Sequence, residues 1–426
     1  MATNNLLTPT MITRKALQIL HQKLNFVGGV NKQYDDRFAQ SGAKIGDALN
    51  VRMPAKYTVR TGATLSAQEH YQRSTALTVD SQYGVDVSFT SKELTMDMDD
   101  FTERHIEPAM AQLAAKIEGD CMSDGYKKIP NYSNATTNAK ITYAYFQKNG
   151  SNISKALAPL SNRTAHIHPD SKVEFMDAVK GLFQDSTNIK SQYREAIMGR
   201  TGGFDVYENT LTPAHTTGSL AGTPLTDGAG QGTANTSNVW ASQTAITVDG
   251  ATSNTTLKAG DIITIGTLAD GFVDVHPETK VSTGQLKTFV VQSDVTLTTQ
   301  ATGGSVTVKP ALIYGSGNAF QNCSLTGGDT DDMTITRIGA ASSAFGQDIF
   351  CHRDAFAFAT ADLEDVSKDG AWGTRRVMDG ISMRIARQYD ITNDAFPCRI
   401  DVLFGFDELY APDGLASRHM YEQDLL

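Results

Sequence analysis

Arginine is absent between Arg200 and Arg337, although the chain has 17 arginines in 426 residues. The arginine-free stretch is rich in Thr, Gly, Ser, Asn and Val. Short segments with β-branched residues alternate there with turn-forming clusters, at residues 245–250, 261–267, 271–280, 286–298 and 305–313. This spacing predicts several short strands joined by tight turns, and hence a small all-β module.

The sequence on both sides of this stretch has a different character, with charged, helical and mixed segments. The expected fold class is therefore α+β, with an all-β, barrel-like domain inserted into a mixed domain. A length of 426 residues and a hydrophobic content of 40% are enough for more than one core.

The overall charge limits the classes of partner. The formal net charge is −10 and the pI is about 5.4. An acidic surface repels phosphate, so we expect no sequence-specific nucleic-acid binding. No apolar run approaches the ~18 residues of a membrane span, and the N-terminus lacks the basic-then-apolar order of a secretory signal. We expect no membrane partner.

No motif indicates catalysis, a cofactor or a metal. The four cysteines show no C-x-x-C spacing, which is typical of isolated buried thiols in a reducing compartment. His166, His168 and Asp170 could ligate a metal from one strand, but no further ligand is near in sequence, and Pro169 to Ser171 favour a helix start. The phosphate-loop, dinucleotide-binding and G-x-S-x-G patterns do not occur. We therefore expect no catalytic residue, no cofactor and no metal.

The first part of the chain predicts elements that cannot bury themselves. Residues 1–45 read as an arm with one amphipathic helix, which must lie on the rest of the chain or on another chain; its apolar face is Ala16, Leu17, Leu20 and Leu24. Residues 46–90 read as a long two-stranded ribbon with a polar tip, whose return path carries Val79, Tyr83, Val85, Val87 and Phe89. A ribbon without a third strand is marginal alone, so we expect it to dock on a neighbouring chain.

The longest predicted helix begins after Asp99 or Asp100 and ends at Gly125. Pro108 either kinks it or marks its true first turn. Its apolar face is predicted to be Ile106, Ala109, Met110, Leu113, Ala114, Ile117 and Cys121. Its charged residues could form salt bridges at an interface or a solvated face, and the sequence leaves both alternatives open; they are Asp100, Glu103, Arg104 and Glu107.

Further along, residues 164–169 predict a strand, followed by a helix that carries Val173, Met176, Val179, Leu182 and Phe183 on its apolar face. Residues 352–364 predict a short helix that passes into a strand. Residues 380–391 and 398–406 alternate apolar and polar residues and predict two long antiparallel strands.

As a whole, the chain resembles phage major capsid proteins of the Hong Kong 97-like fold, and within them the short-tailed, Salmonella-type coat family with an insertion domain. The resemblance lies in three strings: VDVSFTSKELTMDMDDFTERHIEPAMAQLAAKIEGD, LKAGDIITIGTL…VHPETKVSTGQLKTFVVQSDV and HRDAFAFATADLE…GISMRIARQYDITNDAFPCRIDVLFGFDELYAPDGLASR. It implies six parts: an N-terminal arm (1–45), an E-loop ribbon (46–90), a spine helix with peripheral domain (91–138), an axial and peripheral region (139–215), the inserted β domain (216–335) and closing strands (336–426).

The resemblance implies a structural protein, not an enzyme, that self-assembles into hexamers and pentamers of an icosahedral shell around double-stranded DNA. The DNA would be held non-specifically. Expected partners are a scaffolding protein and a portal protein, with room for a decoration protein, and the expected location is the virion capsid after assembly in the bacterial cytoplasm. Some relatives crosslink through a ribbon lysine, near Lys56 here, but relatives with an insertion domain generally do not.

The residues expected at intersubunit contacts are charged residues of the ribbon and of the helix start: Lys56, Arg60, Glu69, Arg73, Asp100 and Arg104. The alternative function is another virion structural protein or a β-domain protein that binds carbohydrate. A catalytic triad or a secretion signal would favour those alternatives, and the sequence has neither.

Overall fold

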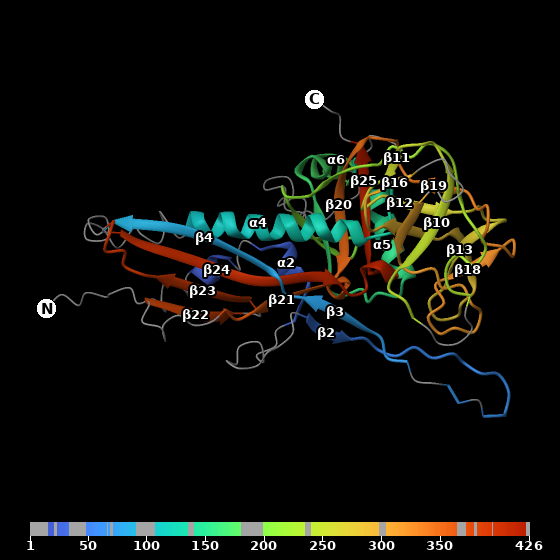
Figure 1. The fold of residues 1–426 in the computed structure, drawn as a ribbon, viewed down its shortest axis with the longest axis horizontal. Helices are drawn as coiled ribbons and strands as arrows, with labels where there is room; N and C mark the ends of the chain where they lie inside the picture. The colour runs from blue at the N-terminus through green and yellow to red at the C-terminus, as the bar shows by residue number, and fades with distance from the viewer. Residues whose placement is uncertain are drawn as a thin grey trace. The chain divides into compact units, whose positions relative to one another are not determined.

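The structure is a computed structural model of the chain. It describes residues 16–20, 24–33, 48–65, 67–68, 71–90, 107–134, 140–179, 199–234, 240–297, 304–363, 372–378, 381–393 and 395–422. The chain forms two compact units (Figure 1). The first unit comprises Met1–Val51, Thr75–Cys121 and Phe356–Asp407, and the second comprises Arg52–Ser74, Met122–Ala355 and Glu408–Leu426.

A six-stranded sheet organises the first unit. Its strand order is β1 (Asn31–Gln33), β21 (Phe356–Ala361), β24 (Ala395–Glu408), β23 (Ile381–Arg387) and β22 (Trp372–Met378), and β4 (Ser81–Thr90) also pairs with β24. β23 and β24 are antiparallel, with Ile385 opposite Ile400. The predicted pair of closing strands is confirmed. So is the short helix before them, which is the 3-10 turn η4 (Arg353–Ala355) leading into β21.

The ribbon is shorter than the sequence predicts. β2 (Ala48–Arg52) pairs with β3 (Ser74–Thr78) in a two-stranded sheet. β4 was expected to be the return path of the ribbon, and this prediction is wrong. β4 instead pairs along its whole length with β24, from Ser81 opposite Phe404 to Thr90 opposite Ala395. The alternating pattern of β4 is compatible with pairing either to the ribbon strand or to β24. Pattern alone does not identify the neighbouring strand.

The N-terminal apolar stripe is buried within the subunit. Residues 16–20 are helical, and Ala16, Leu17 and Leu20 have almost no exposed surface. Nearby, Phe26 of α2 (Phe26–Gly29) packs on the rings of Phe356 and Phe406, with centroids 5.9 and 6.0 Å apart. Of the two predicted alternatives, the helix therefore lies on the rest of its own chain.

The long helix α4 is described over Glu107–Gly125, with Pro108 in its first described turn. Met110, Leu113, Ala114, Ile117 and Cys121 are buried, so the predicted apolar face is confirmed over these positions. Residues 91–106 lie outside the described part of the chain, and the predicted start at Asp99 or Asp100 lies there with them. None of the helices in the described ranges combines the length and apolarity that a membrane crossing requires.

A mixed sheet forms one half of the second unit. Its strand order is β25 (Ala416–Glu422), β20 (Ala344–His352), β5 (Arg163–Ile167), β7 (Phe204–Glu208) and β6 (Arg200–Thr201), with β8 (Ala214–Thr216) also on β20. Helices α5 (Tyr143–Lys155) and α6 (Pro169–Val179) contribute to a core with a cluster of four phenylalanines: Phe146, Phe175, Phe204 and Phe350.

The predicted apolar face of α6 is partly wrong. Val173 is 70% exposed, whereas Phe175, which the sequence analysis did not assign to that face, is buried against Phe146. The helix begins at Pro169, two residues before the predicted capping serine. Residues two positions apart lie on opposite sides of a helix, so Val173 and Phe175 cannot both face the core. Leu182 and Phe183 lie outside the described residues.

Between β8 and β20 lies the inserted β structure. Its main sheet has the strand order β19 (Ile335–Arg337), β12 (Ile262–Ile265), β15 (Thr288–Val291), β17 (Gly304–Lys309), β10 (Thr244–Ala251) and β9 (Gly222–Thr226). The outer strands meet at the bridge between Leu225 and Thr334, so the sheet is partly closed like a barrel. Smaller sheets join β11 (Thr255–Leu257) to β16 (Val295–Leu297), and β13 (Gly271–Val275) to β14 (Ser282–Leu286) and β18 (Cys323–Thr326).

The strands predicted for residues 245–313 are confirmed. Their inward residues form one apolar cluster that includes Ile246, Ile263, Phe272, Phe289 and Val306. The insertion leaves and rejoins the mixed sheet at adjacent points. Thr216 pairs with Ala344, and the Thr217 amide donates to the Ser343 carbonyl at 3.0 Å.

Candidate functional site: the insertion junction and the ribbon

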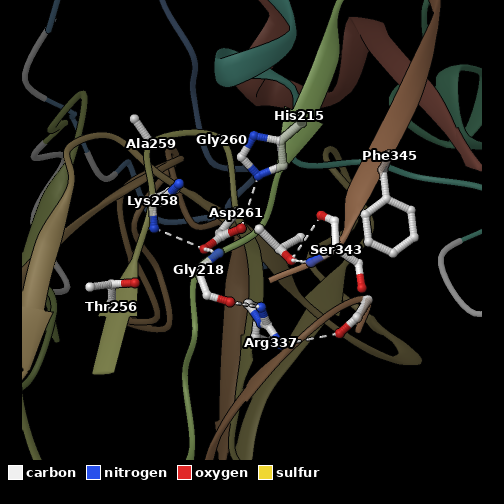
Figure 2. A network of polar contacts seen from close by, with 12 residues as sticks. His215, Gly218, Thr256, Lys258, Ala259, Gly260, Asp261, Arg337, Ser343 and Phe345 are labelled. Atoms are coloured by element: carbon white, nitrogen blue, oxygen red, sulfur yellow. Dashed lines mark hydrogen bonds and ion pairs between the residues drawn. The ribbon is translucent and has the colours of Figure 1, made fainter. Parts of the chain in front are cut away.

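A buried carboxylate holds the junction between the insertion and the mixed sheet (Figure 2). Asp261 directly precedes β12 and is almost fully buried. Its Oδ2 accepts from the backbone amides of Lys258 at 2.8 Å and Gly218 at 3.1 Å, and its Oδ1 lies 2.9 Å from His215 Nε2. Three donors on two segments of chain thus converge on one side chain. Such charge-assisted bonds are stronger than neutral ones.

His215 lies between Asp261 and a tyrosine. Its Nδ1 is 3.2 Å from the hydroxyl of Tyr126, in the 3-10 turn η3 (Tyr126–Lys128). Burial lowers the pKa of His215, and the hydrogen bond to Asp261 offsets this only in part. The ring is therefore neutral near pH 7. Because Asp261 can only accept, Nε2 carries the proton and Nδ1 accepts from Tyr126.

Gly218 is required by close backbone packing at this point. A Cβ built on Gly218 would lie 2.1 Å from the Thr256 carbonyl oxygen and 3.0 Å from Asp261 Oδ2. Its carbonyl oxygen accepts from Arg337 Nη1, and Arg337 Nη2 donates to the Gly339 carbonyl at 3.3 Å. Arg337 therefore ties the chain that enters the insertion to the chain that leaves it.

Arg418 of β25 completes the junction from the mixed sheet. It is fully buried, and it donates to the Gly260 carbonyl at 2.5 Å and to Gln347 Oε1 at 3.3 Å. Its guanidinium carbon lies 5.7 Å from the ring centroid of Tyr126. Burial lowers the pKa of Arg418 to about 10, so it stays charged at neutral pH.

A second set of ion pairs supports the same junction. Glu408, at the end of β24, lies 3.1 Å from the ammonium of Lys128 in η3 and also pairs with Lys309 of the inserted strand β17. All three side chains are at least largely shielded from solvent. Both networks use directional contacts to connect the inserted β structure to other segments of the second unit.

Chemically, the junction can position backbone but offers little for catalysis. Both oxygens of Asp261 and both ring nitrogens of His215 already have partners, so neither has an atom left for a substrate. In the parts of the chain that the structure describes, no group of three or more His, Cys, Asp or Glu side chains is placed to hold a metal ion. His166 is buried in β5, and His168 lies 3.4 Å from Asp170 at the start of α6.

The structure places three of the six predicted contact residues on the ribbon. Lys56 lines a cavity of the second unit, and burial lowers its pKa. Arg60 is exposed and donates to the Gly62 carbonyl, next to the ribbon tip. Arg73 is buried and pairs with Asp413 at 2.7 Å. The other three, Glu69, Asp100 and Arg104, lie outside the described residues.

Arg73 anchors the ribbon to its own chain. Its guanidinium stacks near Trp240, Phe320 and Tyr410, at 5.9, 6.0 and 5.2 Å from the ring centroids. Beyond this anchor the ribbon exposes apolar side chains, with Val59 95% and Leu65 83% exposed. The ribbon is therefore anchored at its base, and beyond the anchor it presents apolar side chains to solvent.

The sequence analysis did not identify the junction residues Asp261, His215 and Arg418. They are far apart in sequence, and none belongs to a recognisable motif. One signal was present: Arg337 ends the long arginine-free stretch, and a lone arginine at the end of a β module suggests a specific buried partner.

Comparison with known proteins identifies the family. A model of the family "P22 coat protein - gene protein 5" matches residues 1–413. No curated protein matches the chain. Among solved structures, the chain is similar to one from Mycobacterium phage Che8, with 9% identity, a TM-score of 0.44, and coverage of 93% of this chain and 90% of that one.

Two further similar structures are the capsid of Ralstonia phage GP4 and a virus-like particle from Pyrococcus furiosus. The first has 7% identity, a TM-score of 0.44 and coverage of 93% and 87%. The second has 5% identity, a TM-score of 0.39 and coverage of 96% and 97%. The family assignment rests on the family model, which spans nearly the whole chain. The chain belongs to the P22 coat protein family.

Proposed function

We infer that the chain is a major capsid protein whose copies form the icosahedral shell of a phage. The observation that carries this function is the family match over residues 1–413. The architecture agrees with it, since a mixed α+β chain carries a barrel-like insertion and a two-stranded ribbon. The family assignment also decides against the alternative of a carbohydrate-binding β protein.

We propose that the ribbon makes the main contact between copies. Tyr57, Val59 and Leu65 are each more than half exposed, and they lie on one short stretch of the second unit. Burying such side chains against a neighbour removes apolar surface from water, and each side chain contributes about 1–3 kcal/mol when fully covered. The same contact recurs at every subunit of a symmetric shell.

Charged residues around this apolar stretch would set its register. Arg60 is exposed, whereas Arg73 would act through the position of the ribbon that it anchors. Lys56, Glu69, Asp100 and Arg104 complete the proposed intersubunit set. Complementary charges at the rim of an interface favour correct pairing more than they add affinity.

The proposals on assembly form, partners and DNA are supported by the family assignment and by the net charge of the chain. We propose assembly as hexamers and pentamers in the bacterial cytoplasm, with a scaffolding protein, a portal protein and in some particles a decoration protein. The shell would enclose double-stranded DNA without sequence-specific contacts, since the net charge of −10 disfavours phosphate binding over the surface as a whole. The role would be structural and not enzymatic, and residues 216–335 would form a domain of their own.

A pair of substitutions at Val59 tests the assembly surface. Val59→Asp places a charge where an apolar contact is proposed, while Val59→Thr keeps the shape and serves as the matched control. Both should leave the free subunit folded, with unfolding free energies within about 0.5 kcal/mol of the parent. Only Val59→Asp should prevent shells, as seen by sedimentation and electron microscopy. Normal shells from Val59→Asp would show that the ribbon tip is not a contact.

A further inference from the structure

A cavity in the second unit concentrates positive charge in an acidic protein. Its volume is about 430 Å³, within the size range of small-molecule sites. Lys56 of the ribbon, Lys148 and Lys155 of α5, and Lys287 between β14 and β15 line it. Two carboxylates, Asp274 and Asp413, also line it. The lining therefore carries four lysines against two aspartates, although the chain as a whole has a net charge of −10.

The two carboxylates are already engaged. Asp274 pairs with Lys287 at 2.7 Å, and Asp413 pairs with Arg73 at 2.7 Å. Lys155 Nζ reaches only the neutral amide oxygen of Gln285, at 3.1 Å. Within the described ranges of the chain, Lys56 and Lys148 have no ion-pair partner. The cavity thus holds more cations than its own anions neutralise.

Repulsion between the lysines in and beside the cavity also indicates an excess of positive charge there. Lys280 stands beside the cavity and donates to the carbonyl of the lining residue Gln321 at 2.9 Å. Burial lowers the pKa of Lys280 to about 8, and the charges of Lys56 and Lys287 contribute. The pKa of Lys56 is lowered by burial and by Arg73 and Lys287, and Asp413 offsets this only in part. A bound anion would relieve this repulsion.

We propose that this cavity is a binding site for a small multivalent anion of the phosphate class, with Lys56 and Lys148 as its main ligands. Ammonium groups bind phosphate oxygens as point charges from several directions, and the four lining lysines come from three separate segments of the chain. The proposal goes beyond the capsid function and does not rest on it. A bound anion would tie the ribbon to α5 and to the inserted β structure within one subunit.

Calorimetry on the purified, unassembled, full-length subunit tests the site, with sodium tripolyphosphate as the probe. We expect saturable binding that weakens steeply with added salt. Lys56→Gln and Lys148→Gln should each weaken binding about fivefold or more, because each removes one of the four cations that line the cavity. Lys116→Gln on α4 makes the same change in net charge at a position 64% exposed in the first unit, and it should bind like the parent.

Thermal unfolding gives a second, independent readout. Without the probe, Lys56→Gln should unfold at the same temperature as the parent or higher, because it removes repulsion. With the probe, the parent should gain stability and the variant should gain little. A loss of stability in the variant without the probe, together with unchanged binding, would make Lys56 a structural residue and overturn the proposal.

A measurement of proton uptake on binding distinguishes an anion in the cavity from one on the open surface. The ammonium of Lys280 faces Lys56, Lys287, Asp413 and the Gln321 carbonyl. At a pH near 8, binding of the anion should raise the pKa of Lys280 and draw in protons, so that the apparent binding heat depends on the buffer. Binding without proton uptake would place the anion elsewhere.

Two further probes define the ligand class. Inorganic phosphate should bind more weakly than tripolyphosphate, because it carries fewer charges. Citrate, a multivalent carboxylate, should bind more weakly than tripolyphosphate if phosphate oxygens are preferred. Tighter binding of citrate through the same lysines would assign the site to carboxylates and overturn the phosphate class. No saturable binding of tripolyphosphate would reduce the cavity to a solvated cluster of lysines.

Discussion

The core of the inserted β structure and its junction with the mixed sheet are built from opposite kinds of residue. The core cluster is apolar throughout, from Ile246 to Ile335. The junction buries Asp261, His215 and Arg418 with hydrogen bonds of 2.5–3.3 Å. Apolar contacts are non-directional and supply stability. Buried polar contacts are directional, and here they determine how the insertion is held within its unit.

The largest effect should come from the apolar core. Phe289→Ala removes a fully buried ring that packs edge-to-face with Phe272 at 6.4 Å between centroids. The lost burial and the cavity left behind should cost about 3–5 kcal/mol of the unfolding free energy. Urea unfolding of the subunit measures this. Leu268→Ala, at a position 56% exposed, is the control and should change little. Equal losses in both variants would contradict a specifically packed core.

At the junction, the unfolding free energy should depend on the hydrogen bonds that a substitution removes more than on the volume that it removes. Asp261→Ala leaves the Gly218 and Lys258 amides and His215 Nε2 without their acceptor, and should cost about 3 kcal/mol. Asp261→Asn keeps one acceptor oxygen and should cost less, about 1–2 kcal/mol. Unfolding measurements on the two variants separate these cases. If Asn were as harmful as Ala, size and hydrogen bonding would matter less here than charge.

A second buried carboxylate, Asp348 of β20, can be compared with Asp261, because it has fewer hydrogen-bond partners. Its Oδ1 accepts from the His168 amide at 2.8 Å, whereas its Oδ2 has no hydrogen-bond partner among the described residues. Burial raises the pKa of Asp348 from 3.8 to about 7. The unfolded chain therefore ionises at a lower pH than the folded one. The resulting destabilisation is absent below pH 3.8, grows up to about pH 7 and is complete above it.

Asp348→Asn should remove this pH dependence. Above pH 7 the variant should be more stable than the parent, on the order of 4 kcal/mol, and the difference should vanish towards pH 4. Chemical unfolding of both proteins across this range measures it. Burial also lowers the pKa of His166 to about 3, which produces the opposite slope, but this contribution is common to both proteins and cancels in their difference. A difference that does not vary with pH would show that Asp348 is ionised in the folded state.

The smallest effect should come from an exposed ion pair. Lys116 and Asp120 on α4 are 2.9 Å apart, with side chains 64% and 37% exposed. Lys116→Gln should change the unfolding free energy by no more than about 0.5 kcal/mol. Asp120 also accepts from the Tyr83 hydroxyl at 2.6 Å and keeps that partner. A loss as large as that of Asp261→Ala would remove the distinction between buried and exposed charges.

The parts of the fold that could be predicted from sequence are those with local patterns. The strands around Ile246 and Ile263, the apolar face of α4 and the strand pair β23–β24 all follow from periodicity. The pairing of β4 with β24 could not be predicted, because an alternating strand fits either of two neighbours. The face of α6 was misjudged because the packing partner decides which side is buried, and Phe175 lies against Phe146.

By itself, the sequence determined the fold class, the inserted β structure and the coat-protein family. These depend on composition, on periodicity and on a pattern spread over the whole chain. Only the tertiary structure decided which residues hold the insertion and which lysines share a cavity. Asp261 and Arg418, like Lys56 and Lys287, meet only after the chain has folded. Such contacts join residues far apart in sequence, and they depend on strand pairing, which local patterns leave open.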